Sequence, residues 1–454
     1  MSEFKIISQH AGSVLVGQLA VMAFGVADTV IVGRYSDAAL AALSVGSALY
    51  ISVYVGLIGI VQALLPIWAE MHGARKHEAV GSSLRQSLYL CGLITAVGMT
   101  ALLFPGPLLR WAQVPGLMLG EVQRYLTVLA FAFAPSLLFR VYSTFNQSLG
   151  KPLLVTGLQV GALMVKVPLS IWLVAGGGGM EPLGAVGCAW ATLVVNYLLL
   201  GLSVVMLRKH ALYKPYRLWQ RMERPDWRQI GDFARLGIPG GLAYMVEVTS
   251  FTLMALFIAR LGTIATASHQ IAASAAAVLY MMPLSMAIAC SARVSFWLGA
   301  NRPDNAKRVV MLGIKLTALV SIALAAIVLI ANKWLASLYS GNPNIVAIGA
   351  ALLTWVAFYH VADALQALCA FLLRCYRITL APLVLYSILL WGLGLYGGYQ
   401  LTYEGLAGRV ATQSASSFWA ASTVAISFVA FFLLALLCHA VRKSLPVNRS
   451  FKAA

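Results

Sequence analysis

The chain has 454 residues, of which 61% are hydrophobic and 10% charged, and its formal net charge is +18. Its mean hydropathy of +0.84 lies far outside the range of soluble domains, which excludes an ordinary soluble protein. The positive charge alone would suit a nucleic-acid partner, so the placement of the basic residues has to decide between nucleic acid and a membrane.

Long apolar runs recur along the whole chain. The hydrocarbon core of a bilayer is about 30 Å thick and needs about 20 apolar residues per helix. The runs of this kind are Ala11–Val32, Ala38–Pro66, Ser83–Phe104, Val122–Thr144, Leu153–Ala175, Leu183–Leu207, Phe233–Ala259, Ile264–Ala292, Val309–Ala331, Ile345–Leu373, Ile378–Leu401 and Ser416–Val441. Barrel strands would instead alternate in polarity over about 10 residues. The sequence therefore predicts an all-α polytopic membrane protein with 12 transmembrane helices.

Motifs of enzymes and of ATP-driven pumps are missing from the sequence. It contains no Walker loop, nucleophile elbow or zinc motif. The six cysteines lie in or at the ends of the predicted helices, without metal-ligand spacing. The first apolar run leads straight into a second, so we expect a retained helix rather than a cleaved signal peptide. The prediction is a protein that is not an enzyme and needs no cofactor.

Basic residues are concentrated in alternate connections between the predicted helices. With the N-terminus inside, Lys166 and Lys315 fall within helices, and 24 of the 32 Lys and Arg residues fall on the inner side. The outer side receives only Arg34, Arg110, Arg124, Arg260, Lys333 and Arg409. Because this bias sets the orientation of membrane proteins, we predict that both termini are cytoplasmic. The basic residues are expected to lie near anionic lipid and not to bind nucleic acid.

The two halves of the chain resemble each other. A shift of 226 positions aligns Val32–Arg34 with Ile258–Arg260, and Gly73 with Gly299. Internal repeats are typical of secondary transporters, whose binding sites lie between the repeats near the bilayer midplane. We predict two pseudo-symmetric six-helix lobes. The N-lobe covers residues 1–207, a basic cytoplasmic linker covers 208–232, and the C-lobe covers 233–454.

Only three of the 14 acidic residues lie well inside predicted helices: Asp28, Glu247 and Asp363. An ionisable group near the bilayer centre costs about 2.5 to 3.5 kcal/mol, so it normally faces a cavity, finds a partner or takes part in transport. Glu247 and Asp363 lie roughly 21 Å and 15 Å along their helices from the cytoplasmic side and can meet at similar depth. Such acids exchange protons or bind an alkali cation, or else tie helices together by buried hydrogen bonds.

Lys166 is the one basic residue placed deep in the predicted N-lobe. It lies about 20 Å into the fifth helix and Asp28 about 26 Å into the first, so the two side chains can form an ion pair within the membrane. The alternatives are snorkelling of the lysine or a helix tilt that brings it to the surface. An ion pair would hold Asp28 ionised and compete with any bound cation.

Three segments carry a resemblance to a known family. They are A-D-T-V-I-V-G-R around Asp28, Y-M-V-E-V-T-S-F around Glu247 and F-Y-H-V-A-D-A-L-Q-A-L-C-A-F-L-L-R-C-Y-R around Asp363. On these residues the chain resembles the multidrug and toxic compound extrusion (MATE) family, in its NorM-like bacterial branch, over nearly its whole length. The resemblance implies a monomeric multidrug exporter of the bacterial inner membrane that exchanges Na⁺ or H⁺ for amphipathic or cationic drugs.

The resemblance also implies roles for individual residues. Glu247 and Asp363 take the positions of the C-lobe acids, which couple transport to H⁺ or hold Na⁺, and Asp28 takes the position of the N-lobe acid. Tyr359, one turn before Asp363, is expected to orient that carboxylate by hydrogen bonding. Gln270, in S-H-Q-I-A, stands at a substrate-lining position together with Asp28 and Asp363.

The chain departs from the branch in the fifth helix. There, V-K-V-P-L-S puts Lys166 and Ser170 where asparagines are usual. This departure counts against a cation site in the N-lobe, so coupling is assigned to Glu247 and Asp363. A flippase for lipid-linked oligosaccharide or peptidoglycan precursors is the alternative within the same superfamily, but it needs several cationic residues to bind pyrophosphate.

Overall fold

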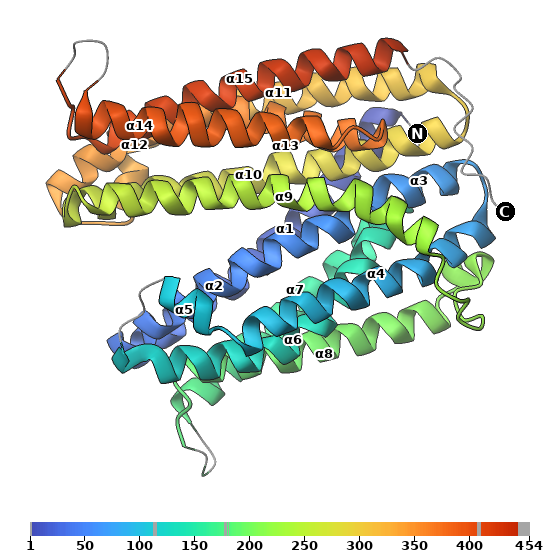
Figure 1. Cartoon of the computed structure of the whole chain (residues 1–454), viewed down its shortest axis with the longest axis horizontal. Helices are drawn as coiled ribbons and strands as arrows, with labels where there is room; N and C mark the ends of the chain where they lie inside the picture. The colour runs from blue at the N-terminus through green and yellow to red at the C-terminus, as the bar shows by residue number, and fades with distance from the viewer. Residues whose placement is uncertain (1, 112–115, 177–178, 180, 406–409, 444–454) are drawn as a thin grey trace. The chain divides into compact units, whose positions relative to one another are not determined.

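The computed structural model describes residues 2–111, 116–176, 179, 181–405 and 410–443. Within these residues the chain is helical and has no strand. The described part contains 12 helical spans that are long and apolar enough to cross a membrane, which confirms the predicted fold class (Figure 1). Arg409 from the charge pattern and Gly177 and Gly178 from the turn after the fifth span lie outside the described residues.

The helices follow the predicted runs and mostly extend beyond them. Their bounds are α1 Glu3–Tyr35, α2 Asp37–Gln62, α3 Leu65–Gly73, α4 His77–Leu103, α5 Gly106–Trp111, α6 Gly116–Ser148, α7 Pro152–Ala175, α8 Ala185–Lys209, η1 Ala211–Tyr216, α9 Trp227–Ala259, α10 Thr263–Gly299, α11 Pro303–Ser337, α12 Pro343–Cys375, α13 Leu380–Tyr386, η2 Ser387–Tyr396, α14 Gly397–Tyr399, η3 Gln400–Glu404 and α15 Ala415–Lys443. The second span joins α2 and α3, and the eleventh joins α13, η2, α14 and η3. Most of the eleventh span, in η2 and η3, is wound as a π-helix.

The chain forms two compact units. One contains Met1–Leu15 and Leu242–Ala454, and the other contains Val16–Gly241. The chain therefore passes from one unit to the other inside α1 and again inside α9, directly after Pro239 and two glycines. The two crossing points match in the sequence repeat. Val16 and Leu242 are the first residues after each crossing, and they are 226 positions apart, which is the offset of the repeat. The units differ from the predicted lobes 1–207 and 233–454 in the assignment of the first 15 residues, of the linker and of residues 233–241, so the lobe boundaries stay a prediction.

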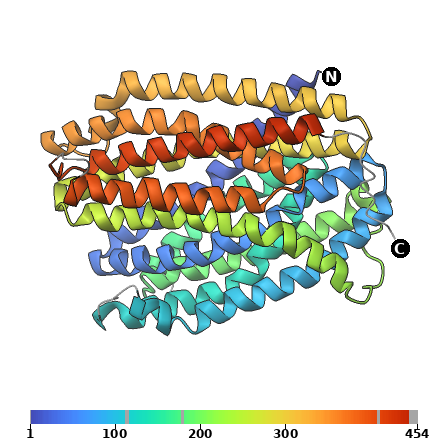
Figure 2. The same cartoon turned by 45° about the horizontal axis from the view of Figure 1, so that its top comes forward.

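Each unit is built around one central helix. In the unit Val16–Gly241, α6 contacts α2, α3, α4, α7 and α8. In the other unit, α12 contacts α10, α11 and α15, and Figure 2 shows these helices of the unit running alongside one another. Most of the buried residues of α12 from Gly349 to Cys375 are small or apolar, which suits its central position, and the polar exceptions include Asp363, Gln366 and Arg374. Asn342 caps its first turn by accepting a hydrogen bond from the Asn344 amide at 2.9 Å.

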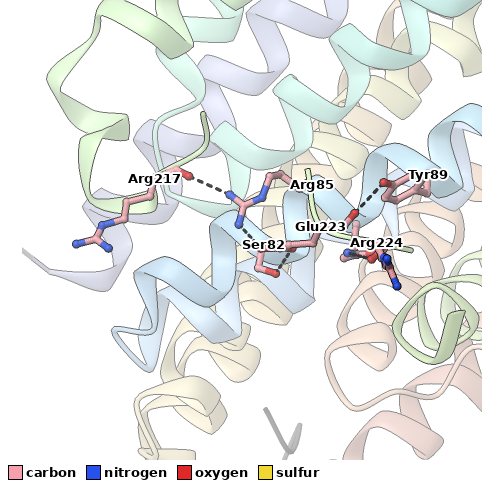
Figure 3. Close-up of polar contacts among 7 residues, drawn as sticks. Ser82, Arg85, Tyr89, Arg217, Glu223 and Arg224 are labelled. Atoms are coloured by element: carbon pink, nitrogen blue, oxygen red, sulfur yellow. Dashed lines mark hydrogen bonds and ion pairs between the residues drawn. The ribbon is translucent and has the colours of Figure 1, made fainter. Parts of the chain in front are cut away.

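The basic linker is folded against the N-terminal half of α4, and it is more ordered than its composition indicates. Arg85, 4% exposed, donates to the Glu223 carboxylate and to the Arg217 carbonyl, the latter at 2.9 Å (Figure 3). Ser82 donates to Glu223 at 2.7 Å, and Tyr89 donates to the Glu223 carbonyl at 2.8 Å. These contacts define a linker clamp of Ser82, Arg85, Tyr89 and Glu223.

The linker clamp should make stability depend on pH. Partial burial opposes ionisation of Glu223, but hydrogen bonds from Arg85 and Ser82 and the charge of Arg85 lower its pKa below the usual 4.5. The contribution to stability is therefore present above about pH 4.5 and is lost as pH falls through the lower folded pKa. Glu223→Gln should cost about 1 kcal/mol at pH 7, since water screens the exposed part of the carboxylate.

Thermal unfolding in detergent at pH 7 and at pH 3.5, roughly a unit below the usual pKa, checks this expectation. The matched control is Glu78→Gln, because Glu78 pairs with Arg217 at 3.1 Å but both side chains are at least 60% exposed. If Glu223→Gln loses no more stability than the Glu78→Gln control at pH 7, the linker clamp does not contribute to stability.

Candidate functional site

The first candidate site lies in the unit Val16–Gly241, between α1 and α7. The Lys166 ammonium donates to both oxygens of the Asp28 carboxylate, at 2.8 Å each. Ser170, one turn beyond Lys166 on the same face of α7, donates to Asp28 Oδ1 at 3.2 Å. The structure thus brings together the two residues that the sequence singled out as a candidate intramembrane ion pair.

A local approach of α1 to α7 at Gly17 accompanies this pair. A Cβ atom on Gly17 would lie 3.2 Å from the Thr156 hydroxyl and closer still to the Gln159 side-chain oxygen, so a larger residue there would make these two side chains move. The helices meet at Gly17 about three turns before Asp28. Further along α7, Lys166 and Ser170, which are one turn apart, both donate to Asp28.

The pair is removed from water. Asp28 is 8% and Lys166 1% exposed, and the ammonium lies 5.8 Å from the centre of the Phe24 ring. Burial of two opposite charges in direct contact costs less than burial of either charge alone. Both carboxylate oxygens of Asp28 accept from the lysine, so Lys166 occupies the place that a bound cation would take.

The second candidate site lies in the other unit, between α9 and α12. Gln366 of α12 donates through Nε2 to Asp363 Oδ1 at 2.9 Å and to Glu247 Oε1 at 3.4 Å. Glu247, Asp363 and Gln366 are 9%, 4% and 0% exposed. One neutral amide therefore joins two buried carboxylates, which we call the carboxylate pair.

Aromatic residues surround the carboxylate pair. Tyr280, Tyr359 and Tyr386 each lie close enough to interact electrostatically with both acids. Tyr386 donates to Gln366 Oε1, and Trp391 of the same span donates to the Val246 carbonyl at 3.3 Å. The eleventh span thus contacts the site both through Gln366 and beside Glu247.

A cation, Arg374, lies within electrostatic range of this site. Arg374, 5% exposed near the end of α12, interacts with Glu247 and Tyr386 over distance rather than by a hydrogen bond. Its guanidinium stacks 4.4 Å from the centre of the Phe371 ring and 5.4 Å from that of Tyr244. Among the described residues, no lysine or arginine forms a salt bridge with either acid of the carboxylate pair, in contrast to Asp28.

The remaining predicted residues have mixed placements. Tyr359 packs edge-on against Phe251 and Trp419, and within the described residues the hydrogen bond to Asp363 comes from Gln366. Gln270 is exposed on α10, and no hydrogen bond links it to the carboxylate pair in the described part of the chain. Their predicted roles in coupling and in lining the substrate path stay predictions.

Sequence reasoning missed Gln366 and Tyr386. Gln366 follows Asp363 by three positions, so the helical period places both on one face of α12. A glutamine within an apolar span needs partners for its amide, and its spacing from Asp363 was the only signal in the sequence.

The described residues contain no group of three or more His, Cys, Asp or Glu side chains that could hold a metal ion. A cation at the carboxylate pair would therefore need further oxygen ligands, from a hydroxyl, a backbone carbonyl or water. Oxygen ligands of this kind suit hard cations. Two buried carboxylates of this kind are chemically able to take up and release a proton or a hard cation.

Comparison with known proteins gives consistent matches. The MatE family model matches residues 14–172 and 239–400. A probable multidrug resistance protein NorM of Aromatoleum aromaticum is 37% identical over 92% of this chain and 90% of that protein. The multidrug resistance protein PmpM of Pseudomonas aeruginosa is 31% identical over 88% of this chain and 84% of that protein.

Solved structures agree on the fold. The eukaryotic MATE transporter AtDTX14 superposes with a TM-score of 0.87 at 20% identity, covering 97% of this chain and 98% of that chain. The Vibrio cholerae MATE transporter VcmN in its bent form superposes with a TM-score of 0.85 at 16% identity, covering 97% of each chain.

Proposed function

Because this chain belongs to the MatE family, whose members are transporters rather than enzymes, we propose that it exports amphipathic or cationic drugs in exchange for H⁺ or Na⁺. Glu247 and Asp363 are the coupling carboxylates of this proposal. The similarity to multidrug resistance proteins over most of the chain supports the substrate class.

One observation carries the assignment of coupling to Glu247 and Asp363. The carboxylate pair is buried and joined by a neutral amide, so either a proton or a cation from the membrane gradient can balance its charge. Asp28 is already balanced by Lys166. The uptake of the coupling ion is therefore proposed for the unit that contains α9 and α12, and Tyr359 is proposed to contribute to the same site.

Drug binding is proposed to involve Asp28, Gln270 and Asp363, as the family resemblance implies. The ion pair of Lys166 with Asp28 also supports drug export over transport of a pyrophosphate-linked lipid. The lysine is already bound to a carboxylate and would have to leave it to bind a phosphate. The protein is proposed to act as a monomer among membrane lipids and without a nucleic-acid partner.

Ethidium efflux from proteoliposomes under separately imposed Na⁺ and H⁺ gradients tests the function. Efflux driven by one of the two gradients, and absent without a gradient, is the expected result. Failure of both gradients to drive efflux of ethidium and of other cationic dyes would overturn the proposal. Movement of a labelled peptidoglycan precursor in the same vesicles would favour the flippase instead.

The chain is a multi-pass inner membrane protein, and its orientation is testable. We expect a reporter fused after Arg224 or at the C-terminus to be cytoplasmic, and one inserted within 176–179 to be external, because basic loops stay inside. Paired reporters that are active on only one side of the membrane measure this. An external signal after Arg224 would reverse the proposed orientation.

A further inference from the structure

The eleventh span is joined to the carboxylate pair by a chain of hydrogen bonds that passes through one side chain. Gln366 has two N–H groups, which donate to Glu247 and Asp363, and one carbonyl oxygen, which accepts from Tyr386. Each polar group of this amide thus has its own partner. We propose that Gln366 is a positioning residue that competes with the coupling ion for the carboxylate pair and passes the state of the pair to the eleventh span.

The orientation of the amide is set by Tyr386. The Tyr386 hydroxyl donates to Gln366 Oε1, which keeps the N–H groups turned toward the two acids. The reversed amide would place a carbonyl oxygen against two carboxylates, which is unfavourable. Both side chains are buried, at 0% exposure for Gln366 and 4% for Tyr386, so water offers little substitute for these bonds.

Competition follows from the atoms involved. A proton or cation that binds either carboxylate, at whichever oxygen, neutralises the charge that strengthens the hydrogen bonds accepted by Glu247 Oε1 and Asp363 Oδ1 from Gln366. Entry of the ion therefore weakens the hold of the carboxylates on the amide. The amide is then free to turn, and its bond with Tyr386 changes with it.

The eleventh span is suited to respond. Its segment Ser387–Tyr396, which begins directly after Tyr386, is π-helical, a winding that is rare and less stable than the α-helix. Trp391 in this segment contacts the Val246 carbonyl, one residue before Glu247. The span thus reaches Glu247 by two routes, one through Gln366 and one through the backbone beside it.

The other unit offers a parallel. At the offset of the repeat, Lys166 of the fifth span corresponds to Gly392 of the eleventh, next to Trp391. Lys166 contacts its acid directly, whereas the eleventh span reaches Glu247 through Gln366 and through a backbone carbonyl. The contact between Lys166 and Asp28 leaves no place for an ion. The contact between the eleventh span and Glu247 passes through Gln366, and an ion at the carboxylate pair can change it.

The inference rests on the proposed coupling at Glu247 and Asp363, and its test uses Gln366→Leu and Tyr386→Phe. Ser387→Ala is the matched control, because the hydroxyl of this neighbour of Tyr386 donates to the Leu383 carbonyl of its own helix turn. The ion dependence of ethidium efflux is measured for each variant in proteoliposomes. The groups near the pair that can also affect this dependence are Tyr244, Tyr280, Tyr359 and Arg374, and they are unchanged in all three variants.

Gln366→Leu should keep efflux but lower the half-saturating Na⁺ concentration, or raise the pH midpoint if H⁺ is the coupling ion. The reason is that the ion no longer competes with a donor, and the expected change is about threefold to tenfold, as for the loss of one or two ordinary hydrogen bonds. Tyr386→Phe should shift the dependence in the same direction by a smaller factor, and Ser387→Ala should leave it unchanged.

Hydrogen–deuterium exchange of peptides covering 380–404 gives a second measurement. Addition of the coupling ion should change exchange there in the wild type and in Ser387→Ala, but not in Gln366→Leu or Tyr386→Phe. If Gln366→Leu fails to fold, Tyr386→Phe alone decides, since it removes a single oxygen atom. An ion dependence and an exchange response equal to the wild type in Tyr386→Phe would overturn the inference.

The two proposals fail in different ways. If no ion gradient drives wild-type efflux, the proposed function fails. If the wild type is ion-driven and Glu247→Gln is inactive, but Gln366→Leu and Tyr386→Phe respond to the ion as the wild type does, the role of Gln366 alone is wrong.

Discussion

Glu247→Gln and Asp363→Asn should each abolish gradient-driven efflux, to less than about one hundredth of the wild-type rate. The amide side chains keep the volume of the acids but cannot release a proton or balance a cation at neutral pH. Both acids are buried and share Gln366, so loss of one leaves the other without its partner in ion binding. Initial rates of ethidium efflux under the driving gradient measure the effect.

The control for this prediction has to separate loss of coupling from loss of folding. Asp304→Asn changes an exposed acid in the first turn of α11 of the same unit and should transport as the wild type does. The two inactive variants should elute from size exclusion as the wild type does and should still equilibrate dye slowly down its gradient. Wild-type rates in both Glu247→Gln and Asp363→Asn would refute the assignment of coupling to these acids.

The sequence was sufficient for the spans and for the charged residues inside them. Apolar runs of membrane length are imposed by the hydrocarbon, and a charge inside such a run stands out because its burial is unfavourable. Asp28, Lys166, Glu247 and Asp363 could therefore be identified, and their depths could be compared from the helical rise alone.

The neutral partners could not be identified in the same way. Gln366 and Tyr386 carry no charge, and polar uncharged residues occur in many membrane helices without a functional role. Their contact also depends on how α12 and the eleventh span are rotated about their axes, which packing decides and hydropathy does not. The π-helical winding after Tyr386 likewise has no signature in the sequence.

The linker shows the same limit of sequence reasoning. Its many basic residues predict an anchor near anionic lipid on the cytoplasmic side, but Arg85, which lies outside the linker on α4, forms hydrogen bonds with it. In the sequence, a basic residue near the end of a membrane helix cannot be distinguished from the basic residues that set the orientation. Only the tertiary structure separates the arginine that forms the clamp from those that face solvent.

The last prediction concerns Asp28 and Lys166, whose two charges cancel within one contact. Removal of either partner leaves an uncompensated buried charge, and the expected loss of stability is about 3 to 5 kcal/mol. Lys166→Asn and Asp28→Asn should therefore each lower the thermal unfolding temperature in detergent clearly. The double variant should recover most of the loss, because two neutral amides leave no charge to bury.

A double-mutant cycle on thermal unfolding measures the coupling between the two residues. The matched control is the same cycle on Glu78 and Arg217, an ion pair at 3.1 Å whose side chains are 68% and 60% exposed, and its coupling should be below about 1 kcal/mol. Purely additive effects of Asp28→Asn and Lys166→Asn would mean that the two residues do not interact in the folded protein. Asp28 would then be available to exchange an ion, and Lys166→Asn should leave the ion dependence of efflux unchanged. A strong coupling, by contrast, predicts that Lys166→Asn uncovers a second ion-sensitive step in efflux, because Asp28 has lost the internal cation that balanced it.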